Sequence, residues 1–192
     1  VVEINPAVVP VAQQYFDFEP SKVTLHFGDG REYINRAPKQ YDAVVLDAFL
    51  GDSSPSHLMS REAFTGIGKM LKPGGVLVIN SFGDFAKGRD FFVASLHKTL
   101  KASFGAVRIH YNPVFGNVFF VATNDKELVQ HHEPDLRGVP GYLQEGIKGA
   151  FDGLMDTDPR SGIVLTDDYN PADAYDAENR ENIRRNLAFR MR

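Results

Sequence analysis

Three acidic residues stand where carboxylates could do chemistry. Glu3 lies near the end of the first apolar segment, Asp29 sits in a Gly-Asp-Gly turn after the second, and Asp47 closes the third. A carboxylate after such a strand can accept hydrogen bonds from both hydroxyls of a ribose. An Asp between glycines can accept from an exocyclic amine, because glycine lets the backbone approach a flat ring closely. Asp47 would then face whatever reacts with the other end of a nucleoside.

Each of the three acids also has a plain structural interpretation. Glu3 could be a surface acid, Asp29 a turn residue, and Asp47 the cap of the next segment. Their order along the chain, one acid after each of three successive strands, favours a common site over three separate structural roles.

The elements that would position these acids alternate between strand and helix patterns. The expected strands are Val1–Ile4, Val23–Phe27, Ala43–Leu46, Val76–Asn80, Ala106–His110 and Val118–Thr123. The expected helices are Ala7–Phe16, a segment after Gly30 to about Arg36, Ser60–Leu71 and about Arg89–Ala102, with a tight turn at Lys72–Gly75. Strands separated by helices of this length predict a parallel sheet covered on both faces. The last two strands are joined too closely for a crossover helix, so one of them should run antiparallel.

In open α/β sheets of this kind, ligands bind outside the carboxyl ends of the strands. The three acids would meet at that edge. We expect one Rossmann-like domain over residues 1–192, with its core in 1–124 and a C-terminal extension in 125–192 that ends in a charged helix.

Composition excludes several classes of function. The 192 residues contain no cysteine, which rules out disulfides and thiolate chemistry. A net charge of −4 argues against nucleic acid as a partner. No apolar run approaches the ~20 residues of a membrane span, and we expect a cytoplasmic protein. His131-His132-Glu133 does not predict a metal site, because adjacent histidines point in different directions.

Four stretches resemble a known family. VVEINPAVV, HFGDGREYI, YDAVVLDAF and LKPGGVLVIN resemble the Rossmann-like class I fold of S-adenosylmethionine-dependent methyltransferases. More narrowly, they resemble the polyamine aminopropyltransferases, the spermidine and spermine synthases. GDGR, the DAFLGDSSPSHL loop and the late LTDDYNP element are similar to bacterial spermidine-synthase-like proteins, and GDGR with DAFLGDS is more specific than KPGG.

The resemblance implies a reaction and its site. Aminopropyltransferases move the aminopropyl group of decarboxylated S-adenosylmethionine onto the amine of a polyamine such as putrescine, with neither a prosthetic group nor a metal. Glu3 would hold the ribose hydroxyls, Asp29 and Gly30 would recognise the adenine, and Asp47 would orient and deprotonate the amine. A homodimer is left open.

The chain departs from the family pattern at three places. The family's first strand and glycine-rich loop are absent before Val1, so we expect an N-terminally incomplete and weakly active or inactive chain. The catalytic Asp of spermidine synthases continues as D-S-(S/T)-D-P, whereas here the second acid, Asp52, comes two positions later. The family's Pro-Thr-Tyr is matched by residues 113–115, whose Phe115 lacks the hydroxyl, although Tyr111 is nearby.

Asp167 and Asp168 have two interpretations. Paired acids would attract a cationic substrate, and they could equally cap the final helix. Asp52, Tyr111, Asp167 and Asp168 are therefore candidate substrate-binding residues. Two other functions stay open for the chain as a whole: an S-adenosylmethionine-dependent methyltransferase, and a non-catalytic nucleoside-binding domain.

Overall fold

The computed structural model describes residues 1–36, 40–48, 55–112, 116–130, 132–158 and 160–175, together with 177, 181 and 185. The chain forms two compact units, Val1–Lys39 and Gln40–Arg192. The single-domain organisation expected from the sequence stays a prediction. Most of the expected final charged helix lies outside the described residues.

The first unit is built on two short parallel strands. Strand β1 (Val2–Glu3) pairs with β2 (His26–Phe27), with Glu3 opposite Phe27. The helices are α1 (Val8–Tyr15), a single 3-10 turn at Pro20–Lys22 and α2 (Gly30–Arg36). Strand β2 is shorter than the Val23–Phe27 expected from its apolar pattern.

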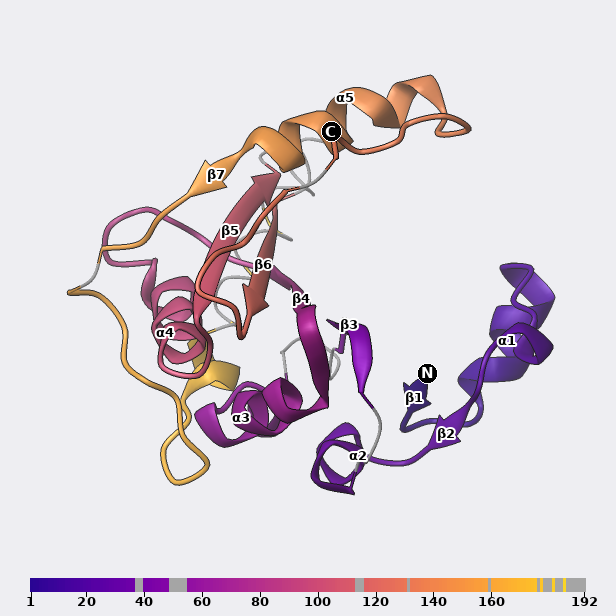
Figure 1. The fold of residues 1–192 in the computed structure, drawn as a ribbon, viewed down its shortest axis with the longest axis horizontal. Coiled ribbons are helices and arrows are strands. Elements are labelled where there is room, and N and C mark those ends of the chain that lie inside the picture. Colours follow the sequence, from indigo (N-terminus) through magenta and orange to yellow (C-terminus); the bar gives the residue numbers. More distant parts are fainter. Residues whose placement is uncertain are drawn as a thin grey trace. The chain divides into compact units, whose positions relative to one another are not determined.

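The second unit contains a five-stranded mixed sheet in the order β3-β4-β6-β5-β7, shown in Figure 1. Its strands are β3 (Tyr41–Leu46), β4 (Leu71–Phe82), β5 (Ala106–Asn112), β6 (Asn117–Thr123) and β7 (Leu154–Met155). Strand β3 runs parallel to β4, and β6 runs antiparallel to both of its neighbours. The expected antiparallel strand is confirmed, and so is the α/β class of the fold.

The predicted turn at Lys72–Gly75 is an interruption inside β4. Tyr41 of β3 pairs with Leu71, and Ala43 pairs with Val76, so residues 72–75 leave the ladder. Gly74 has a φ of 76°, a conformation that residues with a Cβ rarely adopt. The chain re-enters the sheet at Val76, where the sequence predicted the strand to begin.

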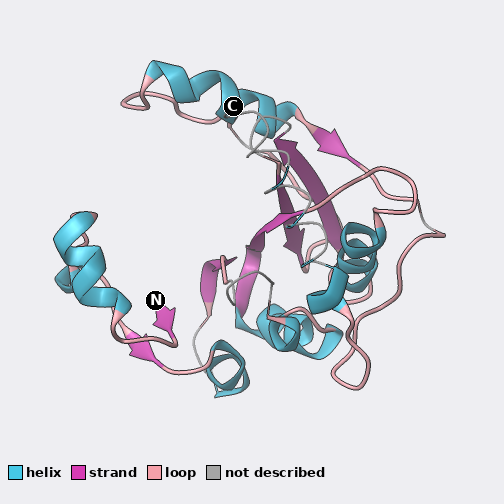
Figure 2. Ribbon diagram, turned by 180° about the vertical axis from the view of Figure 1, so that it is seen from behind, coloured by secondary structure: helices cyan, strands magenta, loops and turns pink. Residues whose placement is uncertain are grey.

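The two faces of the sheet are covered unequally. On one face Leu77, Ile79, Val118 and Phe120 are fully buried, and α3 (Arg61–Met70) and α4 (Phe91–Lys101) supply the rest of that core. On the other face α5 (Gly141–Asp152) contacts β5, where His110 binds the carbonyl of Phe151. Figure 2 shows α3 and α4 together and α5 apart from them. Helices therefore lie on both faces, as expected, but the face of α5 is less buried.

Candidate active site

Asp47 follows β3 directly, and an amide of the neighbouring strand binds its carboxylate. Asn80 of β4 donates a hydrogen bond from Nδ2 to Oδ1 of Asp47 at 3.0 Å. The pairing of Leu46 with Ile79 places the two polar residues side by side near the carboxyl ends of parallel strands. The Asp47 side chain is exposed, which leaves it accessible to a substrate.

A second amide extends this contact to β6. Asn117 donates from Nδ2 to Oδ1 of Asn80 at 3.0 Å. Asn80 pairs with Phe119, so Asn117 lies diagonal to Asn80 on the same face of the sheet. Asn112 of β5 lies directly opposite Asn117 and is buried. We call Asp47, Asn80, Asn117 and Asn112 the polar row, which crosses β3, β4, β6 and β5 at one end of the sheet.

Tyr111 lies on the other face. It pairs with Val118, whereas the next residue, Asn112, pairs with Asn117 of the polar row. Successive side chains of a strand point to opposite faces. The ring of Tyr111 contacts Phe85 edge-on, with 5.3 Å between the ring centroids. The structure therefore does not bring Tyr111 to the polar row.

The first unit brings Glu3 and Asp29 to the same edge of its small sheet. Glu3 ends β1, and the backbone N–H of Gly28 donates to its carbonyl at 3.0 Å. The Glu3 carboxylate accepts from the N–H of Asn5 at 2.7 Å. Asp29 comes two residues after β2, and its Oδ1 accepts from the N–H of Arg31 at 2.7 Å.

Asp29 thereby caps α2 at its first turn. The same oxygen also accepts from the N–H of Glu32 at 3.2 Å. Both N–H groups belong to the start of a helix, where the intrahelical partners are missing. Asp29 therefore has a structural role at this turn, as one of its two interpretations expected. Recognition of adenine by Asp29 and Gly30 stays a prediction.

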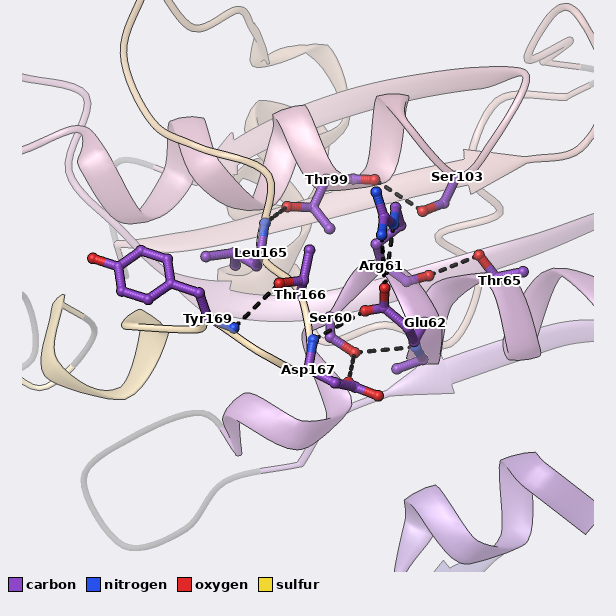
Figure 3. A network of polar contacts seen from close by, with 11 residues as sticks. Ser60, Arg61, Glu62, Thr65, Thr99, Ser103, Leu165, Thr166, Asp167 and Tyr169 are labelled. Atoms are coloured by element: carbon purple, nitrogen blue, oxygen red, sulfur yellow. Dashed lines mark hydrogen bonds and ion pairs between the residues drawn. The ribbon is translucent and has the colours of Figure 1, made fainter.

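Asp167 is held against the start of α3, as Figure 3 shows. The hydroxyl of Ser60 donates to its carboxylate, and its own backbone N–H donates to Oε2 of Glu62 at 3.0 Å. Partial burial raises the pKa of Glu62, but the N–H groups of Glu62 and Asp167 and the charge of Arg61 outweigh it and hold that pKa below its usual value. Asp168 is exposed. A structural role for Asp167 is visible here, and the role of either acid toward a substrate stays a prediction.

Three of the residues singled out from the sequence lie outside the described residues, namely Asp52, Phe115 and His131. Conversely, Asn80 and Asn117 were not predicted as site residues. Asn80 was expected only as the end of the strand Val76–Asn80, and Asn117 lies just before the expected strand Val118–Thr123. The available signal was an Asn at the end of the apolar run VLVIN, where an amide needs a hydrogen-bonding partner once it is partly buried.

Within the described ranges, no group of three or more His, Cys, Asp and Glu side chains could hold a metal ion. The helices of the same ranges include none that is long and apolar enough to cross a membrane.

The sequence of this chain is similar to those of several known proteins. The profile of the family described as "Spermine/spermidine synthase domain" matches residues 1–122. The polyamine aminopropyltransferase of Vibrio vulnificus is 46% identical over 86 residues, which is 43% of this chain and 29% of that protein. The N-terminal histidine N-methyltransferase of Emericella nidulans is 33% identical over 138 residues, which is 66% of this chain and 24% of that protein.

A solved structure gives the same fold. The crystal structure of a probable spermidine synthase from Corynebacterium glutamicum superimposes with a TM-score of 0.57 at 20% identity, over 82% of this chain and 62% of that one. The chain spans only about a quarter of the length of the two curated relatives named above, which are matched over 29% and 24% of their length.

Proposed function

Because the chain belongs to the spermine/spermidine synthase family, we propose that the protein transfers an aminopropyl group from decarboxylated S-adenosylmethionine to the amine of a polyamine such as putrescine. The main support for this proposal is the position of Asp47. It lies within the matched residues 1–122, at the carboxyl end of a parallel strand, with an exposed carboxylate bound to Asn80.

Asp47 is suited to act as the base. An alkylammonium has a pKa near ~10, so its neutral nucleophilic form is scarce at neutral pH. A carboxylate within hydrogen-bond reach can take the proton as the nitrogen attacks. The new C–N bond forms while the C–S bond of the sulfonium breaks, the electron pair of that bond goes to sulfur, and the amine proton goes to Asp47. The leaving group is a neutral thioether nucleoside.

The remaining assignments follow the family resemblance. Glu3 would hold the ribose hydroxyls, and Asp29 with Gly30 would bind the adenine edge. A common nucleoside site for Glu3 and Asp29 is supported by their position, because Glu3 ends β1 and Asp29 closely follows the neighbouring parallel strand β2. The acids Asp52, Asp167 and Asp168 are the candidates for contacts with the polyamine, whereas Tyr111 lies on the face of the sheet opposite the polar row.

The runner-up is a methyl transfer from S-adenosylmethionine. The fungal N-methyltransferase matches 66% of this chain, against 43% for the Vibrio aminopropyltransferase. Both reactions use a sulfonium nucleoside and an amine acceptor, so the same Asp47 would serve either. A nucleoside-binding domain without catalysis is the third alternative.

One experiment separates these functions. The full-length protein is offered putrescine with either decarboxylated or ordinary S-adenosylmethionine, and the products are identified by mass. We expect aminopropylated putrescine from the decarboxylated cofactor only. A methylated product would assign the runner-up, and no product with either cofactor would favour the binding domain.

Asp47→Asn tests the base, and the chain offers a matched control. Asp42 stands at the other end of the same strand, exposed and paired with Lys72 at 2.9 Å. We expect Asp47→Asn to lower kcat by about a hundredfold or more and Asp42→Asn to leave it unchanged. Equal activity of the two variants would exclude Asp47 as the base.

A further inference from the structure

We propose that Asn80 is a positioning residue that aims the carboxylate of Asp47, and that Asn117 fixes the orientation of the Asn80 amide. The kinetic part of this inference rests on the proposed transfer reaction. The hydrogen-bond geometry on which the inference is built does not depend on that reaction.

The two hydrogen bonds of the polar row are donated in the same direction, from Asn117 to Asn80 and from Asn80 to Asp47. Asn117 donates to Oδ1 of Asn80 at 3.0 Å, and Asn80 donates from Nδ2 to Asp47 at 3.0 Å. A carboxylate only accepts, and an amide has one accepting and one donating end. Turning the Asn80 amide over would place its oxygen against Asp47 and its NH2 against the NH2 of Asn117. Only one orientation of the amide therefore satisfies all three side chains.

Asn80 lies within a strand that is paired on both sides, whereas Asp47 comes just after the end of a strand. Strand β4 lies between β3 and β6, and its neighbours in sequence, Ile79 and Ser81, are both fully buried on the opposite face. Strand β3 pairs with β4, and Asp47 is the first residue after β3. An exposed acid just beyond the end of a strand needs lateral support if it is to be held in one orientation. The amide on the central strand supplies that support.

The choice of an amide as the partner has a chemical consequence. A Lys or Arg at position 80 would also orient the carboxylate, but it would neutralise the charge and repel a cationic amine. The neutral Nδ2 of Asn80 orients Asp47 while leaving its negative charge to the substrate. Neighbouring hydrogen bonds also polarise one another, so the bond from Asn117 strengthens Asn80 as a donor.

Kinetics of the full-length protein test this proposal. We expect Asn80→Leu to lower kcat by about tenfold to a hundredfold with little change in KM for the amine, because a small misalignment of a reacting group has effects of that size. Asn117→Leu should give a smaller loss in the same direction. The control is Asn124→Leu, which removes an amide just beyond the other end of β6, where it binds the carbonyl of Gly68 at 2.8 Å. It should leave kcat unchanged.

A double substitution distinguishes positioning from general support of the fold. If Asn80 acts through Asp47, then Asp47→Asn combined with Asn80→Leu should be no slower than Asp47→Asn alone, within about twofold. A further tenfold loss in the double variant, or full activity of Asn80→Leu, would overturn the proposal. A wild-type protein without aminopropyl transfer would contradict the proposed function instead.

Side-chain amide resonances give a readout that needs neither activity nor a stable Asn80→Leu variant. In the folded protein labelled with ¹⁵N-asparagine, Asp47→Ala should shift the NH2 signals of Asn80 and leave those of Asn124 in place. Asn117→Leu should shift the signals of Asn80 as well. Unchanged Asn80 signals in Asp47→Ala would show that the hydrogen bond is absent, and the positioning role would fall with it.

Discussion

The hydroxyl of Ser60 donates a hydrogen bond to the carboxylate of Asp167, which lies 107 residues further along the chain. The same hydroxyl oxygen accepts from the N–H of Ala63 at 3.1 Å and so caps α3. The N–H of Arg61 reaches the carbonyl of Leu165 at 2.8 Å in the same region. Ser60 thus joins the start of α3 to a segment of the C-terminal extension (Figure 3). Its hydroxyl oxygen takes part both in the helix cap with Ala63 and in the contact with Asp167.

We predict that Ser60→Ala lowers the free energy of unfolding by about 1–2 kcal/mol, because it removes a helix cap and a hydrogen-bond donor to the Asp167 carboxylate. Urea denaturation measures this change. Ser103→Ala is the control, since its hydroxyl donates to the carbonyl of Thr99 at 3.0 Å at the end of α4 and caps no helix start. Equal losses in the two variants would show that the contact with Asp167 adds nothing.

The side chains of Asn170 and Asp173 bind the backbone of Ser56, the first residue of the short 3-10 helix Ser56–Leu58. Asn170 donates from Nδ2 to the carbonyl of Ser56 at 2.8 Å, and Asp173 accepts from the N–H of Ser56 at 2.9 Å. We predict that Asn170→Asp, which removes the donor, accelerates hydrogen exchange at the backbone N–H groups of Leu58 and Met59. Asp168→Asn in the same loop serves as control. Unaltered exchange in Asn170→Asp would mean that the short helix around Leu58 stands without this anchor.

Gly162 should tolerate no side chain. Its φ is 71°, and a Cβ there would lie 2.4 Å from the backbone nitrogen of Ser95 on α4. Gly138 has a similar φ of 81°, but open space around its Cβ position. We predict that Gly162→Ala lowers stability by about 3 kcal/mol or more and Gly138→Ala by about 1 kcal/mol, as thermal unfolding would show. Similar losses would mean that α4 moves aside.

The sequence predicts the elements whose signals are local. The apolar run ending at Leu46 and the Ser before Arg61 both stand close to the observed bounds of β3 and α3. Strand β7 escaped prediction because Leu154–Met155 is only two residues long and is defined by its pairing with β5. A segment that short carries no periodicity of its own.

The contacts of the candidate site were harder to predict because they depend on register. Strand β5 was expected to end at His110, but it continues to Asn112. The two extra residues place Tyr111 on one face and Asn112 on the other, and a shift of one residue would exchange them. Likewise, Asn80 and Asn117 meet only through the antiparallel pairing of β4 with β6. No local pattern in the sequence contains that pairing.

His97 on α4 is a buried titratable group outside the candidate site. Its exposed fraction is 5%, and its Nδ1 lies 2.8 Å from the hydroxyl of Thr157. Burial lowers the pKa of His97 below its usual 6.5, the charge of Lys101 lowers it further, and Asp156 opposes both. The folded protein therefore keeps this imidazole neutral at pH values where the unfolded chain protonates it.

We predict that this histidine makes the protein less stable in mild acid. Between the lowered pKa of the folded state and 6.5, the unfolded state binds up to one more proton than the folded state. The free energy of unfolding therefore falls as the pH drops through this range, by up to about 1.4 kcal/mol per pH unit. His97→Gln keeps a polar partner for Thr157 and should flatten this part of the curve in urea unfolding between pH 7 and 5. If His97→Gln keeps the wild-type slope, the acid sensitivity comes from other groups.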